Sequence, residues 1–382
     1  MTETSRKQWL DRVRKFAQTR VAPAAAAWSL GEAPSPDMQT EAGRHGLFGI
    51  ELPTDLGGGG YGFAGKVDAS EMLAAADFGF AMSVINTHNV ALRLAISAPG
   101  SLKARFLPDL LAGRKSACTA LTEPGAGSDL AAIATTAEPA ADGWVLNGEK
   151  SWIINARHAD LALVFAQTDG TAGLQGIGAF LVELSDAGVS RHAIESGFSQ
   201  TSIGTGGFVL TKVHVGEDRL ILPPGAAFRT IIEEINGARV YVAAMCCGML
   251  DAAIETVTSY GNRRSVFGRK LKDHQAWRQA LGEAETELAA IRALTADAAG
   301  RVARGEDARL SAAQAKIAAV EVGQRHLPAL LHAMGAEGLR PEHCLARHLG
   351  ALQTAALADG ANGLLKQQVA KLSRPAIPTT EA

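Results

Sequence analysis

The sequence has only four cysteines in 382 residues, at positions 118, 246, 247 and 344. They form no C-x-x-C pair, so the pattern indicates neither a zinc site nor a redox dithiol. Cys246 and Cys247 are adjacent in an apolar run, where small core residues are the expected use of cysteine. We therefore predict no metal site, buried thiols and a reducing, cytoplasmic location.

The sequence also lacks a strong net charge and a long apolar run. Its formal charge is −2 and its pI is near 6.6, so it offers no general field for nucleic acid or an anionic membrane. No uninterrupted run of about 20 apolar residues suggests a transmembrane helix. The N-terminal segment carries Glu3 and Asp11 among its basic residues and has no apolar core, which argues against a signal peptide. We expect no nucleic-acid partner and no membrane insertion.

The length of the chain and the order of its sequence patterns predict three domains in a mainly α fold with a central β domain. A hydrophobic fraction of 47% and a charged fraction of 20% are typical of a globular protein, and the length allows two or three compact domains. Alanine-rich helical patterns come first, β-type patterns follow, and helical patterns return. The expected domains are an N-terminal α-helical domain (1–115), a central β domain (116–222) and a C-terminal α-helical bundle (223–382).

Individual elements can be predicted within these domains. Trp9, Val13 and Phe16 recur at helical spacing and indicate one face of an opening helix. In the β domain we expect a hairpin with its turn at Asn147–Gly148 and short strands over 161–166, 177–182 and 208–215. Their regular spacing is typical of a small barrel or sandwich. The expected C-terminal helices cover 228–260, 274–304, 309–334 and 341–357, and their alanine-rich faces favour helix packing, including packing against a second subunit.

Three segments have more specific patterns. Residues 120–129 read ALTEPGAGSD, a turn whose glycines would let backbone N–H groups approach a ligand oxygen, and Ser128 and Asp129 could cap the next segment. Residues 146–155 read LNGEKSWIIN, and residues 260–275 read YGNRRSVFGRKLKDHQ. Taken singly, the three are compatible with an ordinary connection, a hairpin with a half-buried tryptophan and a solvated basic turn.

Together these segments resemble the signatures of the acyl-CoA dehydrogenase family, and the resemblance spans nearly the whole chain in order and spacing. It implies an N-terminal helical domain, a β-barrel or sandwich domain and a C-terminal four-helix bundle, with FAD as cofactor. It also implies that Leu121 and Thr122 hydrogen-bond the pyrimidine edge of the flavin. Gly127 and Ser128 would then lie in the cofactor loop, with Ser128 near both the FAD phosphates and the acyl thioester.

Further cofactor contacts follow from the same resemblance. Trp152 would lie against the flavin rings. Ile154 stands where the family has a threonine that hydrogen-bonds flavin N5, which changes the tuning of the flavin. Arg264 would pair with FAD phosphates across a subunit interface, Phe267 would line the adenosine part, and Gln275 would hydrogen-bond the same cofactor. A shared FAD implies a homodimer or homotetramer.

A fourth segment, HAMGAEGL at 332–339, is similar to the family's Gln-x-x-Gly-Gly-x-Gly motif. It keeps Gly335, which we assign to the cofactor site, and Gly338. His332 and Ala336 depart from the motif. A lone histidine near a helix end is usually structural, so we predict no catalytic role for it.

The residue aligned with the catalytic glutamate of many family members is Asp359, in the segment LADGANGLL at 357–365. The alternative is that Asp359–Gly360 is only a helix-ending turn. Some relatives carry the base directly before an arginine of the first long C-terminal helix, but here Ala238 precedes Arg239 and cannot accept a proton. We therefore predict Asp359 as the catalytic base and assign Arg239 to substrate binding, together with Ser128.

The predicted function is FAD-dependent α,β-dehydrogenation of an acyl thioester in fatty acid metabolism. Asp359 would take the α-proton, the β-hydrogen would leave as hydride to flavin N5, and the product would be a trans-2-enoyl thioester. The substrate would be an acyl-CoA or an acyl-carrier-protein thioester, and an electron-transfer flavoprotein would accept the electrons. The alternatives are a carrier-protein-linked dehydrogenase of secondary metabolism, a flavin-dependent monooxygenase on the same scaffold, and a catalytically silent homologue kept as a binding subunit.

Overall fold

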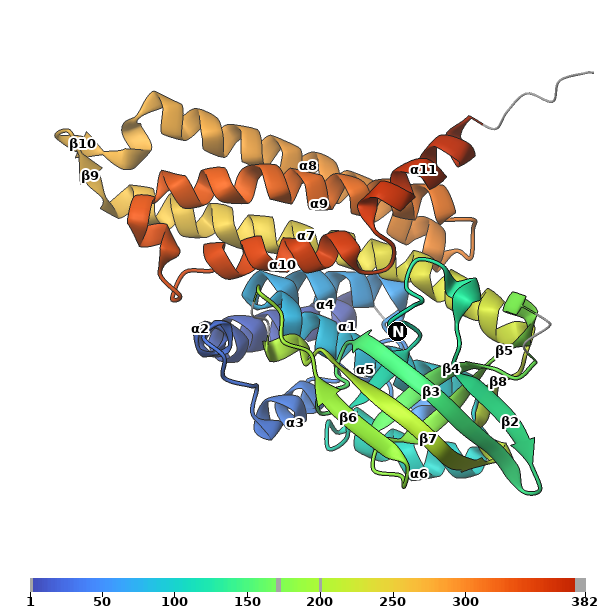
Figure 1. Cartoon of the computed structure of the whole chain (residues 1–382). Helices are drawn as coiled ribbons and strands as arrows, with labels where there is room; N and C mark the ends of the chain where they lie inside the picture. The colour runs from blue at the N-terminus through green and yellow to red at the C-terminus, as the bar shows by residue number, and fades with distance from the viewer. Residues whose placement is uncertain (1–2, 170–172, 199–200, 375–382) are drawn as a thin grey trace, which may run out of the picture. The chain divides into compact units, whose positions relative to one another are not determined.

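The computed structural model describes residues 3–169, 173–198 and 201–374. The chain divides into two compact units (Figure 1). The first unit comprises residues 1–69 and 76–233, and the second comprises residues 70–75 and 234–382.

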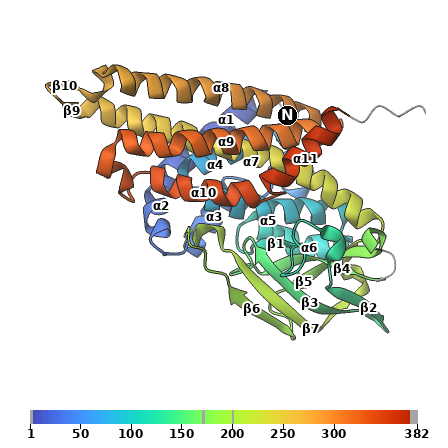
Figure 2. The same cartoon turned by 45° about the horizontal axis from the view of Figure 1, so that its top comes forward.

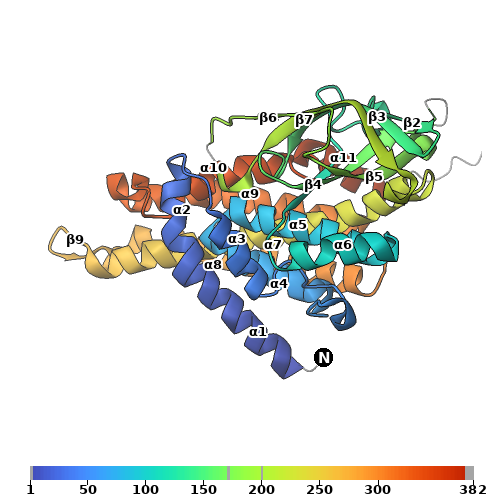
Figure 3. The same cartoon turned by 90° about the horizontal axis from the view of Figure 1, so that it is seen from below.

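The first unit opens with helices whose apolar faces form its core. Trp9, Val13 and Phe16 are at most 2% exposed, as the sequence predicts, and the Trp9 ring stacks on Tyr61 with 4.1 Å between ring centroids. In Figure 3, α5 and α6 run side by side. The helical elements are α1 (Glu3–Phe16), a π-helical segment (Ala17–Val21), α2 (Ala22–Ser29), α3 (Pro36–Arg44), α4 (Gly62–Ala76, of which 70–75 belong to the second unit), α5 (Phe78–Ser97) and α6 (Gly100–Leu111).

An eight-stranded sheet follows within the described part of the first unit. Its order is β6-β7-β3-β2-β4-β5-β8, and β1 pairs with β4 in parallel. Every residue of β4 is buried, as an apolar strand in the middle of a core requires. The predicted strands at 161–166, 177–182 and 208–215 are confirmed. The strands are β1 (Ala117–Ala120), β2 (Thr136–Ala140), β3 (Gly143–Ile153), β4 (Leu161–Gln167), β5 (Ile177–Glu183), β6 (Val189–Ala193), β7 (Gly206–Gly216) and β8 (Leu220–Leu222).

The predicted hairpin turn at Asn147–Gly148 is wrong. Strand β3 runs without interruption through both residues, and β2 pairs with it from Thr136 to Ala140. The pairing of β3 with β7 shifts register between Leu146 and Gly148, and Gly148 has φ of 149°. The Asn147 side chain accepts a hydrogen bond from the Lys212 backbone N–H at 2.8 Å. The Asn-Gly pair therefore marks a β-bulge, which uses glycine for the same conformational reason as a turn.

The second unit is a helical bundle. Figures 1 and 2 show α8 and α9 running alongside each other, with α7 and α10 beside them. The first three predicted helix ranges are confirmed to within three residues. The fourth begins later than predicted, because residues 341–344 form a turn whose carbonyls accept hydrogen bonds from Arg347. The helices are α7 (Ala226–Arg263, of which 226–233 belong to the first unit), α8 (Gln275–Ala303), α9 (Arg309–Ala333), α10 (Leu345–Leu357) and α11 (Asn362–Ser373).

Helix α7 is unusually apolar for its length. By length and composition it could cross a membrane, but 78% of its most apolar stretch is buried inside the protein, which is typical of a core helix. Cys246 and Cys247 lie in this stretch. All four cysteines are buried and free, and burial raises the pKa of the Cys246 thiol to about 12. The thiols are small core groups, as the sequence indicates.

Candidate active site

The loop at residues 121–129 is fixed to the sheet by a buried ion pair. The Glu123 carboxylate accepts hydrogen bonds from Lys150 Nζ at 2.7 Å and from the backbone N–H groups of Ala134 and Thr135 at 2.7 and 3.0 Å. Burial alone would raise the pKa of Glu123, but Lys150 and these hydrogen bonds lower it. Burial lowers the pKa of Lys150 to about 8 against the opposing effect of Glu123. Both groups are therefore charged at neutral pH.

Strand β3, which carries Lys150, also brings several predicted cofactor residues together. The Ser151 backbone N–H donates to Thr122 O at 3.1 Å, and Lys150 Nζ donates to Leu121 O at 3.2 Å. Trp152 follows directly, with φ of 59° and an indole side chain that leaves the residue 60% exposed. Ile154 is half-buried. The segment at Leu121 and Thr122 is thus hydrogen-bonded to the two residues that directly precede Trp152.

The glycine-rich half of the loop is open. Gly127 and Ser128 are exposed, and a Cβ placed on Gly127 would meet only the Thr122 methyl group, at 3.8 Å. Asp129 caps the short helix that follows by accepting from the Ala131 N–H at 3.1 Å, as predicted. Backbone N–H groups of this loop are therefore accessible to an anionic or planar ligand.

Asn155 anchors the end of this strand, a role that sequence reasoning did not predict. Its side-chain amide donates to Ser83 O at 2.9 Å, Ala117 O at 3.0 Å and Thr87 Oγ1 at 3.2 Å. It is fully buried and has φ of 68°, in the left-handed region where asparagine is tolerated better than most residues. The segment that carries Trp152 and Ile154 is thereby held between α5 and β1.

In the second unit, the structure brings Arg239 and Asp359 together. Arg239 Nε donates to Asp359 O at 3.0 Å, and Arg239 Nη1 donates to Asn236 Oδ1 at 2.8 Å. Asp359 follows α10 and has φ of 53°, a conformation that costs energy for a residue with a Cβ. Its carbonyl is thus occupied. Its carboxylate and its backbone N–H form no hydrogen bond within the described residues.

The electrostatic setting of Asp359 suits a proton acceptor. Burial raises the pKa of its carboxyl group above the ordinary value, and the charges of Lys316 and Arg239 act in the opposite direction. A raised pKa makes a carboxylate a stronger base.

The hairpin after α7 exposes the predicted adenosine-site residues. It consists of β9 (Ser265–Val266) and β10 (Arg269–Lys270), closed by the Leu271 N–H donating to Arg264 O at 2.8 Å. Phe267 at its tip is 94% exposed and has φ of 51°. Arg264 and Gln275 are exposed as well. Within the described part of the chain, the ring contact that Phe267 makes is an edge contact with His274, at 6.5 Å between centroids, and most of the phenylalanine stays exposed.

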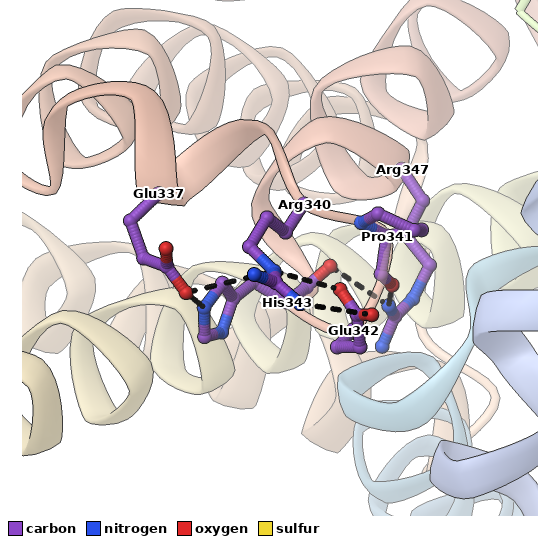
Figure 4. A network of polar contacts seen from close by, with 6 residues as sticks. All are labelled: Glu337, Arg340, Pro341, Glu342, His343 and Arg347. Atoms are coloured by element: carbon purple, nitrogen blue, oxygen red, sulfur yellow. Dashed lines mark hydrogen bonds and ion pairs between the residues drawn. The ribbon is translucent and has the colours of Figure 1, made fainter.

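Local ion pairs order the segment that follows Gly335. His343 Nε2 lies 3.3 Å from Glu337 Oε1, and Arg340 Nε lies 3.3 Å from Glu342 Oε2 (Figure 4). Arg347 Nη1 donates to His343 O at 3.0 Å. Gly335 and His332 are both exposed at the end of α9.

Comparison with known proteins decides the family. The N-terminal, middle and C-terminal domain models of acyl-CoA dehydrogenase match residues 3–114, 118–213 and 226–373. The chain belongs to the acyl-CoA dehydrogenase family. It is 30% identical to a glutaryl-CoA dehydrogenase of Desulfococcus multivorans, with 94% of this chain and 93% of the relative covered. The predicted family and fold class are thereby confirmed.

Two further likenesses support this assignment. A caffeyl-CoA reductase–Etf complex subunit of Acetobacterium woodii is 30% identical, with 76% of this chain and 77% of the relative covered. The solved butyryl-CoA dehydrogenase of Megasphaera elsdenii has a TM-score of 0.91 and 27% identity, and the alignment covers 98% of this chain and 99% of that one.

Acyl-CoA dehydrogenases are flavin-dependent oxidoreductases with FAD as cofactor, and the residues present fit that group. The open loop at 124–129 offers accessible backbone N–H groups, and the exposed Trp152 indole offers a planar apolar surface beside Thr122. Leu121, Thr122, Gly127, Ser128, Trp152 and Ile154 belong to the first unit. Arg239, Arg264, Phe267, Gln275, Gly335 and Asp359 belong to the second. The individual roles of all twelve stay predictions.

Proposed function

We propose that the protein removes the α- and β-hydrogens of an acyl-CoA thioester, with Asp359 as the acceptor of the α-proton. The supporting observation is which polar groups of Asp359 already have hydrogen-bond partners. Its carbonyl is bound by Arg239, while its carboxylate and N–H remain available. A carboxylate can accept a proton, and a free N–H can donate to the thioester oxygen as negative charge develops there.

The chemistry divides between the residue and the cofactor. Asp359 takes the α-proton as the Cα–H bond breaks, and the electron pair of that bond forms the Cα–Cβ double bond. FAD, when bound, accepts the β-hydrogen with its electron pair. The product is then a trans-2-enoyl thioester and a protonated Asp359.

The proposed substrate carrier is coenzyme A, because the names of the relatives refer to glutaryl-CoA, caffeyl-CoA and butyryl-CoA. We propose an electron-transfer flavoprotein as the electron acceptor, because the caffeyl-CoA relative is named as part of an Etf complex. We also propose a homo-oligomer in which Arg264, Phe267 and Gln275 contact FAD across a subunit interface. The extreme exposure of Phe267 supports this.

The test is anaerobic mixing of the FAD-loaded protein with a panel of acyl-CoAs while the flavin absorbance is followed. We expect bleaching by the parent protein, and a loss of rate of about 10²- to 10⁴-fold in Asp359→Asn, which removes the base. Asp251→Asn is the matched control, since Asp251 is an exposed partner of Arg292. Asp359→Glu, which keeps a carboxylate, should retain measurable bleaching.

Bleaching of Asp359→Asn at the parent rate would show that another group takes the proton. The panel also includes pantetheine-linked acyl carrier protein. If the acyl carrier protein substrate reduces the flavin and no acyl-CoA does, the proposed carrier, coenzyme A, is wrong. Rapid NADH-dependent oxygen consumption would instead indicate monooxygenase chemistry.

A further inference from the structure

Two cations hold the main chain of the turn that carries Asp359. Lys316 Nζ donates to Gly360 O at 2.6 Å and to Ala356 O at 3.3 Å. Arg239 Nε donates to Asp359 O at 3.0 Å. The three carbonyls fall within residues 356–360, whereas the cations come from α9 and α7. The turn is therefore fixed from two neighbouring helices by charge-assisted hydrogen bonds.

Lys316 is buried to an extent that is rare for lysine. Its residue surface is 0% exposed, and it lies on a face of α9 made of small apolar residues. Lysine is almost never fully buried unless it is paired, because its charge loses hydration. An alanine or methionine would fill this face without that penalty. The charge at this place therefore points to a role beyond packing. The apolar residues one turn away from Lys316 on this face are Ala312, Ala313, Ala319 and Val320.

We propose that Lys316 is a positioning residue that holds the Asp359–Gly360 turn in its left-handed conformation and keeps the Asp359 carboxylate ionised. This inference rests on the proposed function, since the ionisation of Asp359 matters only if Asp359 accepts the proton. The geometry supports the first part, because Asp359 and Gly360 have φ of 53° and 103° and Lys316 binds the Gly360 carbonyl. The second part follows from the positive charge of Lys316, which favours the ionised form of the Asp359 carboxyl group.

The charges around Lys316 are few. Asp359 attracts its ammonium group, Arg239 repels it, and Cys246 is neutral because burial raises its thiol pKa to about 12. Among the described residues, no titratable group of α8, α10 or α11 adds to these effects. Burial lowers the pKa of Lys316 to about 8, so it is charged at neutral pH. Removing Lys316 leaves Arg239 alone to oppose the desolvation of Asp359.

The first experiment measures the rate of anaerobic flavin bleaching against pH in Lys316→Gln and Lys316→Met. Both changes remove the positive charge, and glutamine keeps a hydrogen-bond donor. We expect the acid limb of the profile to move up by about one pH unit in both variants, because an opposite charge nearby lowers a carboxyl pKa by about 1–3 units. In Lys316→Met the plateau rate should also fall by about 10-fold or more, since the turn loses its anchor.

Lys366→Met is the matched control, because Lys366 is a lysine whose ion pair, with Glu321, is exposed to solvent. It should overlay the parent profile. If Lys316→Met does not fold, Lys316→Gln alone decides the shift of the acid limb.

The second experiment does not depend on catalysis. Hydrogen exchange measured by mass spectrometry reports on the amides of Ala358, Leu364 and Leu365, whose N–H groups donate to Thr354 O and Ala361 O. We expect this segment to exchange about 10-fold faster in Lys316→Met than in the parent protein. In Lys366→Met its exchange rate should equal that of the parent.

The two proposals fail separately. If Asp359→Asn bleaches at the parent rate, the proposed function fails, and the exchange data alone then decide whether Lys316 holds the turn. If Asp359→Asn is silent while both Lys316 variants keep the parent pH profile and exchange rates, the positioning role of Lys316 is wrong and the proposed function stands.

Discussion

Asp359 places a carboxyl group where the folded protein disfavours its charge. Burial raises its pKa, and its φ of 53° adds backbone strain. Such costs are accepted at functional sites because the same features make the group reactive. Lys316 and Arg239 offset part of the electrostatic cost, and they bind the carbonyls of Gly360 and Asp359, respectively.

The raised pKa gives a pH-dependent stability difference for Asp359→Asn. Between the ordinary pKa of 3.8 and the raised value, the folded state binds more protons than the unfolded state, so this carboxyl group destabilises the fold as pH rises. We expect Asp359→Asn to melt higher than the parent at pH 7, by about 2 °C. The difference should shrink towards pH 4. Thermal unfolding of the FAD-loaded proteins across this range checks it, and a constant difference would contradict the raised pKa.

At the scale of elements, the cofactor loop and β3 are joined by polar contacts around a lysine that is 0% exposed. Lys150 pairs with Glu123 and also binds Leu121 O, and Ser151 binds Thr122 O. Breaking a buried ion pair by removing one partner is far more costly than removing both, because it leaves a charge without compensation.

We expect Glu123→Gln to lower the free energy of unfolding by about 3–5 kcal/mol and to weaken FAD retention, because Lys150 is left buried without an anionic partner. Urea unfolding and the ratio of flavin to protein absorbance measure the two effects. Glu138→Gln, at an exposed position of β2, is the control. A loss no larger than that of the control would show that the ion pair does not fix the loop.

At the scale of the whole molecule, the hairpin after α7 presents Phe267 at 94% exposure beside the exposed Arg264. A ring exposed in this way, with one edge contact to His274, contributes little to the stability of the single chain, so its replacement should leave the fold unchanged.

We expect Phe267→Glu to shift the protein from an oligomer to a monomer and to lower its FAD content, because a charge would enter the proposed subunit interface. Sedimentation velocity and flavin absorbance measure both. Phe198→Glu, at another exposed phenylalanine, should change neither. An unchanged oligomer in the Phe267 variant would exclude this hairpin from the interface.

The sequence alone determined what depends on local order along the chain. Periodic apolar residues and turn residues located most helices and the strands at 161–166, 177–182 and 208–215. Ordered motifs led to the family and to FAD. The bulge at Asn147–Gly148 was misread because a bulge and a turn require the same residues. The start of α10 was misplaced because residues 341–344 form a turn, and two carbonyls of that turn accept hydrogen bonds from the distal Arg347 side chain.

Only the tertiary structure decided which distant residues share one environment. Three pairings show this. Glu123 and Lys150 are 27 positions apart in the sequence, and Asn155 and Ser83 are 72 apart. Lys316 lies 44 positions before Gly360, whose carbonyl it binds in the Asp359 turn. For the pairing of Lys316 with the Asp359 turn, the local indication in the sequence was a lysine among the alanines of α9. Pairing across such separations depends on how helices and strands pack, and burial, which sets the charge balance at each pair, exists only once they have packed.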